Sequence, residues 1–208
     1  MQGMTIKAAL FKLRAFIALI FIFSFFAFTS DAFLSSTNLI ILTKHVAINA
    51  ILAIGMTFVI LTSGIDLSVG SIVGLCGMIA GLLIDKGLVI EFLNVVIYFE
   101  IWVIVIISVI VGFIFGCING FIITRFSVAP FIATLGMLVS ARGAAAWYNN
   151  GKPVSFLTDG FTSLGQGAWP VVIFLTVALV FHILMRYTKY GKHTYAIGSN
   201  EEAARVAG

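Results

Sequence analysis

Charged residues are scarce in this sequence. It contains 12 Lys and Arg and 8 Asp and Glu among 208 residues, so 10% of the chain is charged while 61% is hydrophobic. A soluble domain carries about 25% charged residues, and the composition therefore excludes that class and predicts an integral membrane protein. The formal net charge of +4 does not indicate a nucleic-acid partner, because basic residues in membrane proteins mark cytoplasmic loops.

The residues that would support catalysis or metal binding are also missing. Cys76 and Cys117 both lie in apolar runs, so we interpret them as small hydrophobic residues rather than a disulfide. His45, His182 and His193 are far apart and lack acidic or cysteine neighbours at metal-ligand spacing. The chain has no Gly-x-x-x-x-Gly-Lys-Ser/Thr phosphate loop. We therefore expect no metal, no cofactor, no catalytic residue and no ATP hydrolysis by this chain.

Long apolar runs dominate what is present. Crossing the hydrocarbon core takes about 20 apolar residues, and on that scale the sequence predicts an all-α, polytopic transmembrane helix bundle. The first run follows basic residues, as in a signal peptide, but no convincing cleavage site follows it, so we expect a retained span. The predicted spans are Leu13–Thr29, Val46–Ser63, Val69–Ile84, Ile101–Thr124, Pro130–Tyr148 and Trp169–Met185.

The basic residues predict the orientation, because Lys and Arg near the spans favour the cytoplasmic side. A cytoplasmic N-terminus leaves only Lys44, Lys86 and Lys152 outside and Arg142 within a span. The same orientation places the segment Asn149 to Ala168 outside, where its glycines predict an irregular loop. For the charged segment Asp85 to Glu100 we expect a short interfacial helix. The basic residues predicted inside are Lys7, Lys12, Arg14, Arg125, Arg186, Lys189, Lys192 and Arg205.

The stretch Gly64-Ile-Asp-Leu-Ser-Val-Gly70 interrupts two apolar runs. One interpretation is a surface turn in which Gly64 ends one helix and Asp66 or Ser68 caps the next. The other is an interrupted helix whose freed backbone faces a ligand or a cavity. The second interpretation makes this stretch part of a substrate path or gate.

Polar groups within the predicted spans extend that candidate path. Asn119 and Thr134 suit either interhelical hydrogen bonds or substrate contacts, and Arg142 suits either a functional role or snorkelling to the outer interface. Glycines repeat at helical spacing in two spans and predict close helix packing. The candidate path or gate residues are Gly64, Asp66, Ser68, Gly70, Asn119, Thr134 and Arg142; the repeating glycines are Gly70, Gly74, Gly77 and Gly81, and Gly112, Gly116 and Gly120.

The last segment, residues 187–208, is polar and predicted to be a cytoplasmic coupling loop. Ser199 or Asn200 can cap a short helix that carries Glu201 and Glu202 in its first turn, where the helix dipole favours acids. The small residues that follow give this helix a smooth surface, which suits docking into the groove of a partner. The residues predicted to couple to that partner are Glu202, Ala203, Ala204 and Gly208.

Four motifs together resemble a known family. Glu202-Ala-Ala-x-x-x-Gly208 resembles the EAA loop with which permease subunits of ATP-binding-cassette (ABC) importers contact their ATPases. The Gly64–Gly70 stretch, Ala129-Pro-Phe-Ile-Ala-Thr-Leu-Gly136 and Tyr190-Gly-Lys-His-Thr-Tyr-Ala-Ile-Gly198 resemble, in this order, the ribose-type monosaccharide permeases. We therefore treat residues 1–208 as one transmembrane permease domain.

The resemblance implies a larger assembly in the bacterial plasma (inner) membrane. The family's permease has about ten spans, so about six are present here. It pairs with a second permease copy, as a homodimer or heterodimer, and with an ATPase subunit that binds the ATP. A periplasmic or lipid-anchored sugar-binding protein delivers a ribose-like sugar or related polyol. The alternative that the residues leave open is a self-sufficient carrier or channel for small polar solutes.

Overall fold

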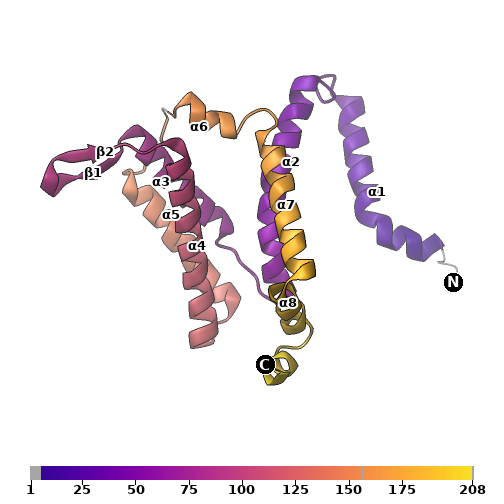
Figure 1. Cartoon of the computed structure of the whole chain (residues 1–208). Coiled ribbons are helices and arrows are strands. Elements are labelled where there is room, and N and C mark those ends of the chain that lie inside the picture. Colours follow the sequence, from indigo (N-terminus) through magenta and orange to yellow (C-terminus); the bar gives the residue numbers. More distant parts are fainter. Residues whose placement is uncertain (1–5, 156, 208) are drawn as a thin grey trace. The chain divides into compact units, whose positions relative to one another are not determined.

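The computed structural model describes residues 6–155 and 157–207, with side chains described from Leu13 onward. It is largely helical, with one small two-stranded sheet in the described part, which confirms the all-α class. The chain forms two compact units, Met1–Val46 and Ala47–Gly208, and helix α2 runs through the boundary between them. Each unit is described by itself below (Figure 1).

Every predicted span contains a helix. Among the described residues, α2, α4 and α7 are long and apolar enough to cross a membrane, and Leu13–Thr29 and α3 are shorter apolar helices. α5 forms as predicted, but it is neither among the helices apolar enough to cross a membrane nor among the shorter apolar helices. The six helices are α1 (Ile6–Thr29), α2 (Ser36–Leu61), α3 (Val69–Asp85), α4 (Ile101–Phe126), α5 (Pro130–Tyr148) and α7 (Trp169–Tyr187).

The second helix begins ten residues before the predicted span, at Ser36 rather than Val46. Ser35 supplies the start signal, because its Oγ accepts a hydrogen bond from the Asn38 backbone N–H at 3.3 Å. Lys44 lies inside the resulting helix, since one charged residue does not interrupt the helical hydrogen bonds. The predicted boundary at Val46 was therefore wrong.

Aromatic packing organises the first unit. The ring of Phe33, in the connection after α1, lies 5.1 Å from Phe23 and 5.8 Å from Phe26. The Asn38 side-chain amide of α2 donates to the Phe33 backbone carbonyl at 2.7 Å. These contacts hold the turn between the two helices.

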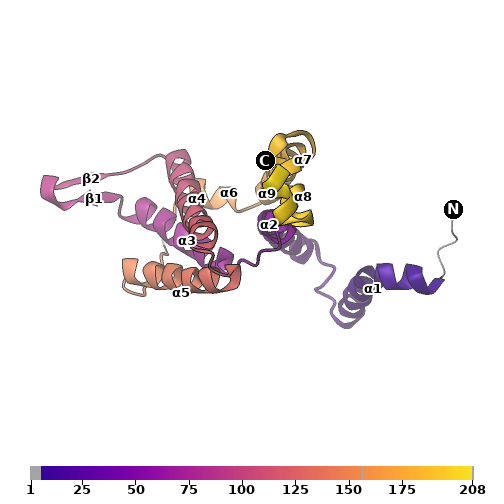
Figure 2. The same ribbon diagram turned by 90° about the horizontal axis from the view of Figure 1, so that it is seen from below.

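In the second unit, α3 packs against both α4 and α5 (Figures 1 and 2). Ala80, Leu83 and Ile104 form its buried core. Lys86, which follows α3, donates to the Asn149 side chain at the end of α5 over 3.1 Å. The C-terminal ends of α3 and α5 therefore meet. Asn119, late in α4, bonds Ser68 at the start of α3, so α4 runs in the opposite direction, as consecutive spans require.

The segment between α3 and α4 is a β-hairpin, so the predicted interfacial helix was wrong. Strands β1 (Leu88–Ile90) and β2 (Val95–Ile97) pair antiparallel, with Val89 opposite Val96. The short 3-10 helix η1 (Glu91–Leu93) connects them. The β-branched residues on both sides of this turn favour strand over helix.

The connection between α5 and α7 is mostly irregular, as predicted, but includes the short helix α6 (Asp159–Leu164). After α7, the chain forms two further helices, α8 (Lys189–Ser199) and α9 (Glu201–Ala207). The predicted loop over 187–208 is therefore mainly helical within the described residues.

The predicted glycine contacts form only in part. An added Cβ on Gly81 would lie 3.0 Å from a Val154 methyl carbon, and one on Gly112 would lie 3.5 Å from the Cys76 sulfur. The other five repeating glycines have open space around an added Cβ: Gly70, Gly74, Gly77, Gly116 and Gly120. Most of the repeating glycines therefore make no close helix contact within the described residues.

Candidate functional site: the break after α2 and the C-terminal groove

Helix α2 ends in a Schellman motif. The Gly64 N–H donates to the Val59 carbonyl at 2.8 Å, and the Ser63 N–H donates to the Ile60 carbonyl at 3.0 Å. The left-handed residue is Ser63, with φ of 59°, so the prediction that Gly64 takes the cap position was wrong by one residue. Position 64 favours glycine for a steric reason, because an added Cβ would lie 3.1 Å from the Val59 side chain.

Asp66 fixes the start of α3. Its Oδ1 accepts hydrogen bonds from the Ser68 N–H at 2.8 Å and from the Ser68 hydroxyl at 2.6 Å. This is a local turn bond from a carboxylate to the residue two positions later. Ser68 is fully buried and occupies the position before the first residue of α3, but its side chain makes no cap hydrogen bond. Ser68 therefore occupies the helix-cap position that the first interpretation predicted. Asp66 does not cap α3 itself but holds Ser68 in place through these two hydrogen bonds.

Asn119 joins this turn to α4. Its Nδ2 donates to the Ser68 Oγ over 2.9 Å, in a side chain that is 4% exposed. A serine hydroxyl has one proton, and Ser68 gives that proton to Asp66, so Asn119 must be the donor. This arrangement sets the orientation of the amide and leaves the buried Asn119 Oδ1 without a donor among the described residues.

Thr134 attaches the turn to α5. Its Oγ1 lies 3.2 Å from the Ile65 carbonyl and 2.8 Å from the Pro130 carbonyl. Thr134 is 1% exposed, so its hydroxyl is satisfied by these backbone acceptors. Residues from three separate parts of the chain therefore meet at the break between α2 and α3.

Two predicted path residues lie apart from this cluster. Gly70 is exposed on α3, and an added Cβ there would meet no atom within 4 Å. Arg142 is exposed on α5, eight residues beyond Thr134. Eight residues correspond to about 12 Å along a helix. The cluster therefore consists of Gly64, Asp66, Ser68, Asn119 and Thr134.

The helices after α7 have their own start signals. The Thr188 hydroxyl accepts from the Gly191 N–H at 3.4 Å at the start of α8. Asn200 Oδ1 accepts from the Ala203 N–H at 3.0 Å at the start of α9. Glu201 and Glu202 occupy the first turn of α9, as predicted. Of the two predicted caps, Asn200 is the one that forms.

A groove of about 640 Å³ lies between α8 and α9. The α8 residues on its wall recur at spacings that place them on one face of a helix. Of the predicted coupling residues, Ala204 lines the groove, Glu202 and Ala203 are exposed, and Gly208 lies outside the described residues. The lining residues are Lys192, His193, Ala196, Ile197, Glu201, Ala204, Arg205 and Ala207.

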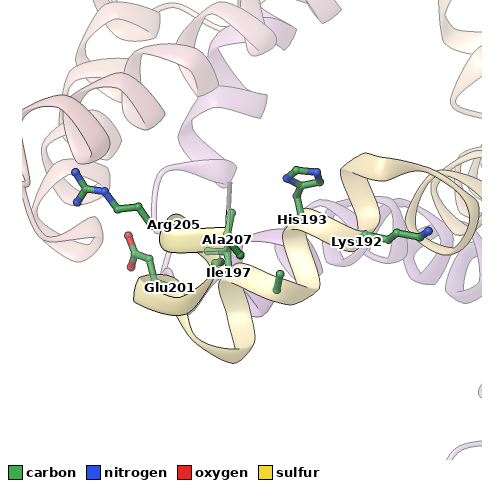
Figure 3. Close-up of a pocket in the computed structure, with 8 residues that line it drawn as sticks. Lys192, His193, Ile197, Glu201, Arg205 and Ala207 are labelled. Atoms are coloured by element: carbon green, nitrogen blue, oxygen red, sulfur yellow. The ribbon is translucent and has the colours of Figure 1, made fainter.

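The groove has an apolar lining with charged groups at its ends. In Figure 3, Glu201 and Arg205 extend at one end, while Lys192 extends away at the other. An apolar surface between charged rims is typical of the core of a protein–protein interface. Sequence reasoning missed Lys192 and His193 because it treated this segment as a loop. The repeat of groove residues at 192, 193, 196 and 197 was the available signal.

The family described as "Branched-chain amino acid transport system / permease component" matches residues 38–208. The chain belongs to this family. The match includes every helix from α3 to α9 and nearly all of α2. It therefore covers both the cluster at the helix break and the C-terminal groove.

Individual relatives are import permeases for sugars. The ribose import permease protein of Haemophilus influenzae is 34% identical over 96% of this chain and 61% of its own length. The ribose import permease protein of Bacillus subtilis is 35% identical over 95% of this chain and 60% of its own length. The galactose/methyl galactoside import permease protein of Salmonella typhimurium is 30% identical over 93% and 61%. The resemblance to ribose-type permeases is thereby confirmed.

The chain spans about three fifths of the length of these relatives. No solved structure matches it significantly. The family and the apolar helices together identify a multi-pass membrane permease component.

Proposed function

We propose that this chain is a permease subunit of an ABC importer that carries a monosaccharide across the bacterial plasma membrane. The observation that carries the proposal is the similarity, over almost the whole chain, to permeases named for ribose and galactose import. A fructose import permease protein of Bifidobacterium longum is also 33% identical over 82% of the chain. The shared substrate class of these relatives is a monosaccharide, and ribose or a related polyol is the closest fit.

The energy comes from a separate ATPase subunit, which binds the ATP, and the permease has no ATPase site of its own. The groove between α8 and α9 supports this division of roles, because it follows the span α7 directly and offers an apolar lining to a partner. Burying one large apolar side chain there would contribute about 1.5–3 kcal/mol. Lys192 at one end of the groove favours an acidic group on the ATPase, whereas Glu201 and Arg205 at the other end favour a border that carries both charges.

The remaining partners follow from the same proposal. A second permease copy, identical or homologous, completes the path, and a periplasmic or lipid-anchored binding protein delivers the sugar. The N-terminus is cytoplasmic, which places α8 and α9 on the side of the ATPase. The alternating directions of α3, α4 and α5 are compatible with this arrangement.

The cluster at the helix break holds the polar backbone between α2 and α3 in one conformation within the membrane protein. Buried polar groups of irregular backbone require such hydrogen-bond partners. Asp66, Ser68, Asn119 and Thr134 supply them. Gly70 and Arg142, exposed on α3 and α5, are proposed to lie along the substrate path.

The test is sugar uptake by the complete gene product in proteoliposomes with its ATPase and binding protein. We expect ATP-dependent uptake of labelled ribose or a related sugar, and none with an ATPase whose phosphate-loop lysine is replaced. The matched control is the permease alone. Equal uptake by the permease alone would favour the self-sufficient carrier and overturn the proposal.

A further inference from the structure

The end of α2 contacts both α7 and α8 through one aromatic side chain. The ring of Phe58 lies 5.2 Å from that of Phe181 on α7, with the planes at 70°, and 6.3 Å from that of Tyr190 on α8. Edge-to-face pairs at this distance stabilise helix contacts. Phe58 thus connects the last turn of α2 to the first turn of α8.

Gly198 makes a second contact between the same two helices. An added Cβ at Gly198 would overlap the backbone carbonyl oxygen of Leu61, the last residue of α2. Only glycine allows this approach, because the atom it faces is backbone and cannot rotate away. Tyr190 and Gly198 are eight residues apart, about two helical turns, so α8 is held at both ends.

The start of α8 is fixed to α7 in the same way. An added Cβ on Gly191 would overlap the Met185 carbonyl oxygen, and Gly191 is buried. The orientation of α8 relative to α2 and α7 therefore depends on contacts with backbone atoms, which leave little freedom for sliding.

Leu61 is followed directly by the linker Thr62–Leu67. Within this linker the Ile65 carbonyl accepts a hydrogen bond from the Thr134 hydroxyl, and directly after it the Ser68 hydroxyl accepts one from the Asn119 amide. The linker is thus anchored to α8 at one end, through Leu61, and to α4 and α5 at the other.

We propose that Gly198 and Phe58 are positioning residues for coupling, which make α8 move together with the end of α2. A displacement of α8 then reaches the Thr62–Leu67 linker without passing through α7. This inference rests on the proposed function, in which an ATPase contacts α8 and α9. It adds the contacts through which a movement of α8 is transmitted to the break between α2 and α3.

The test compares Gly198→Ala with Gly55→Ala in the complete importer. Both glycines lie in helices, so both changes favour the helical conformation, but an added Cβ on Gly55 meets nothing within 4 Å. We expect both variants to co-purify with the ATPase. Gly198→Ala should lower the stimulation of ATP hydrolysis by sugar-loaded binding protein by about two- to thirtyfold, and Gly55→Ala should leave it unchanged.

A second readout follows the linker itself. In a chain without its native cysteines, Thr62→Cys should react with a thiol reagent at a rate that depends on ATP, and Gly198→Ala should remove that dependence. Phe58→Leu, which loses the ring contacts but adds no atom, should weaken the ATP dependence of this labelling. It replaces Gly198→Ala in the experiment if that variant is poorly produced. Wild-type stimulation and ATP-dependent labelling in these variants would overturn the inference. Failure of the unmodified chain to bind any ATPase would instead contradict the proposed function.

Discussion

The Asn119 amide nitrogen donates to the Ser68 hydroxyl oxygen over 2.9 Å and joins residues 51 positions apart in the sequence. The direction of this bond is determined by Asp66, which takes the only proton of Ser68. One carboxylate therefore sets the orientation of an amide on another helix.

The chemistry at position 119 predicts a specific order of variants. Asn119→Asp should be more destabilising than Asn119→Leu, because the aspartate would bury a charge facing the Ser68 oxygen, which has no proton left to donate. Asn119→Leu loses a hydrogen bond worth about 1 kcal/mol but also removes an unpartnered oxygen. Thermal unfolding of the purified proteins in detergent measures both. Equal stability of the two variants would contradict the assigned orientation of the amide.

Asp66 offers a distinction between a structural and a transport role. Asp66→Asn keeps an oxygen that can accept from Ser68, whereas Asp66→Ala removes both hydrogen bonds, at a cost of about 1–3 kcal/mol. We expect Asp66→Ala to lower membrane abundance and Asp66→Asn to restore it. Quantitative immunoblots normalise sugar uptake per molecule. Loss of uptake in both variants at normal abundance would show that the carboxylate contacts substrate or acts as a gate.

Thr134→Val should loosen the helix break with little change in side-chain volume. The valine cannot donate to the Ile65 carbonyl, and the expected loss of stability is about 1 kcal/mol. The control is Thr176→Val on α7, because among the described residues the Thr176 hydroxyl bonds only the Val172 carbonyl of its own helix. Proteolysis of the Ile65 region should accelerate for Thr134→Val and not for Thr176→Val. Equal rates would show that the Thr134 bond does not restrain the turn.

The predicted topology is testable by labelling single cysteines in intact cells. Cys76 and Cys117 are replaced first, since Cys117 is exposed. Lys152→Cys should react with an impermeant reagent from outside, and Arg125→Cys and Lys189→Cys should react only after permeabilisation. Labelling of Arg125→Cys in intact cells would show that the predicted orientation is wrong.

The C-terminal groove separates two neighbouring alanines. Ala204 lines the groove and Ala203 is exposed outside its wall. Ala204→Trp should therefore fill the groove and abolish ATPase co-purification, while Ala203→Trp, the matched control, should retain it. Membrane abundance is measured for both variants. Wild-type co-purification of Ala204→Trp would exclude this groove as the docking surface.

The sequence by itself determined the helices and their local signals. Apolar runs long enough for the bilayer predicted all six long helices, because apolar side chains in lipid require a backbone whose hydrogen bonds are made within each segment. Asn200 and the acidic residues after it predicted α9 for an equally local reason, a side-chain cap followed by favourable charge at the helix start.

The tertiary structure alone decided which of these parts meet. No local pattern could show that Asn119 reaches Ser68, or that Thr134 reaches Ile65, because both bonds depend on how α4 and α5 pack against α3. The role of Gly198 was hidden for the same reason: its lack of a side chain matters only where the backbone of Leu61 approaches. Helix formation depends on neighbours along the chain, whereas these contacts depend on residues brought together by packing.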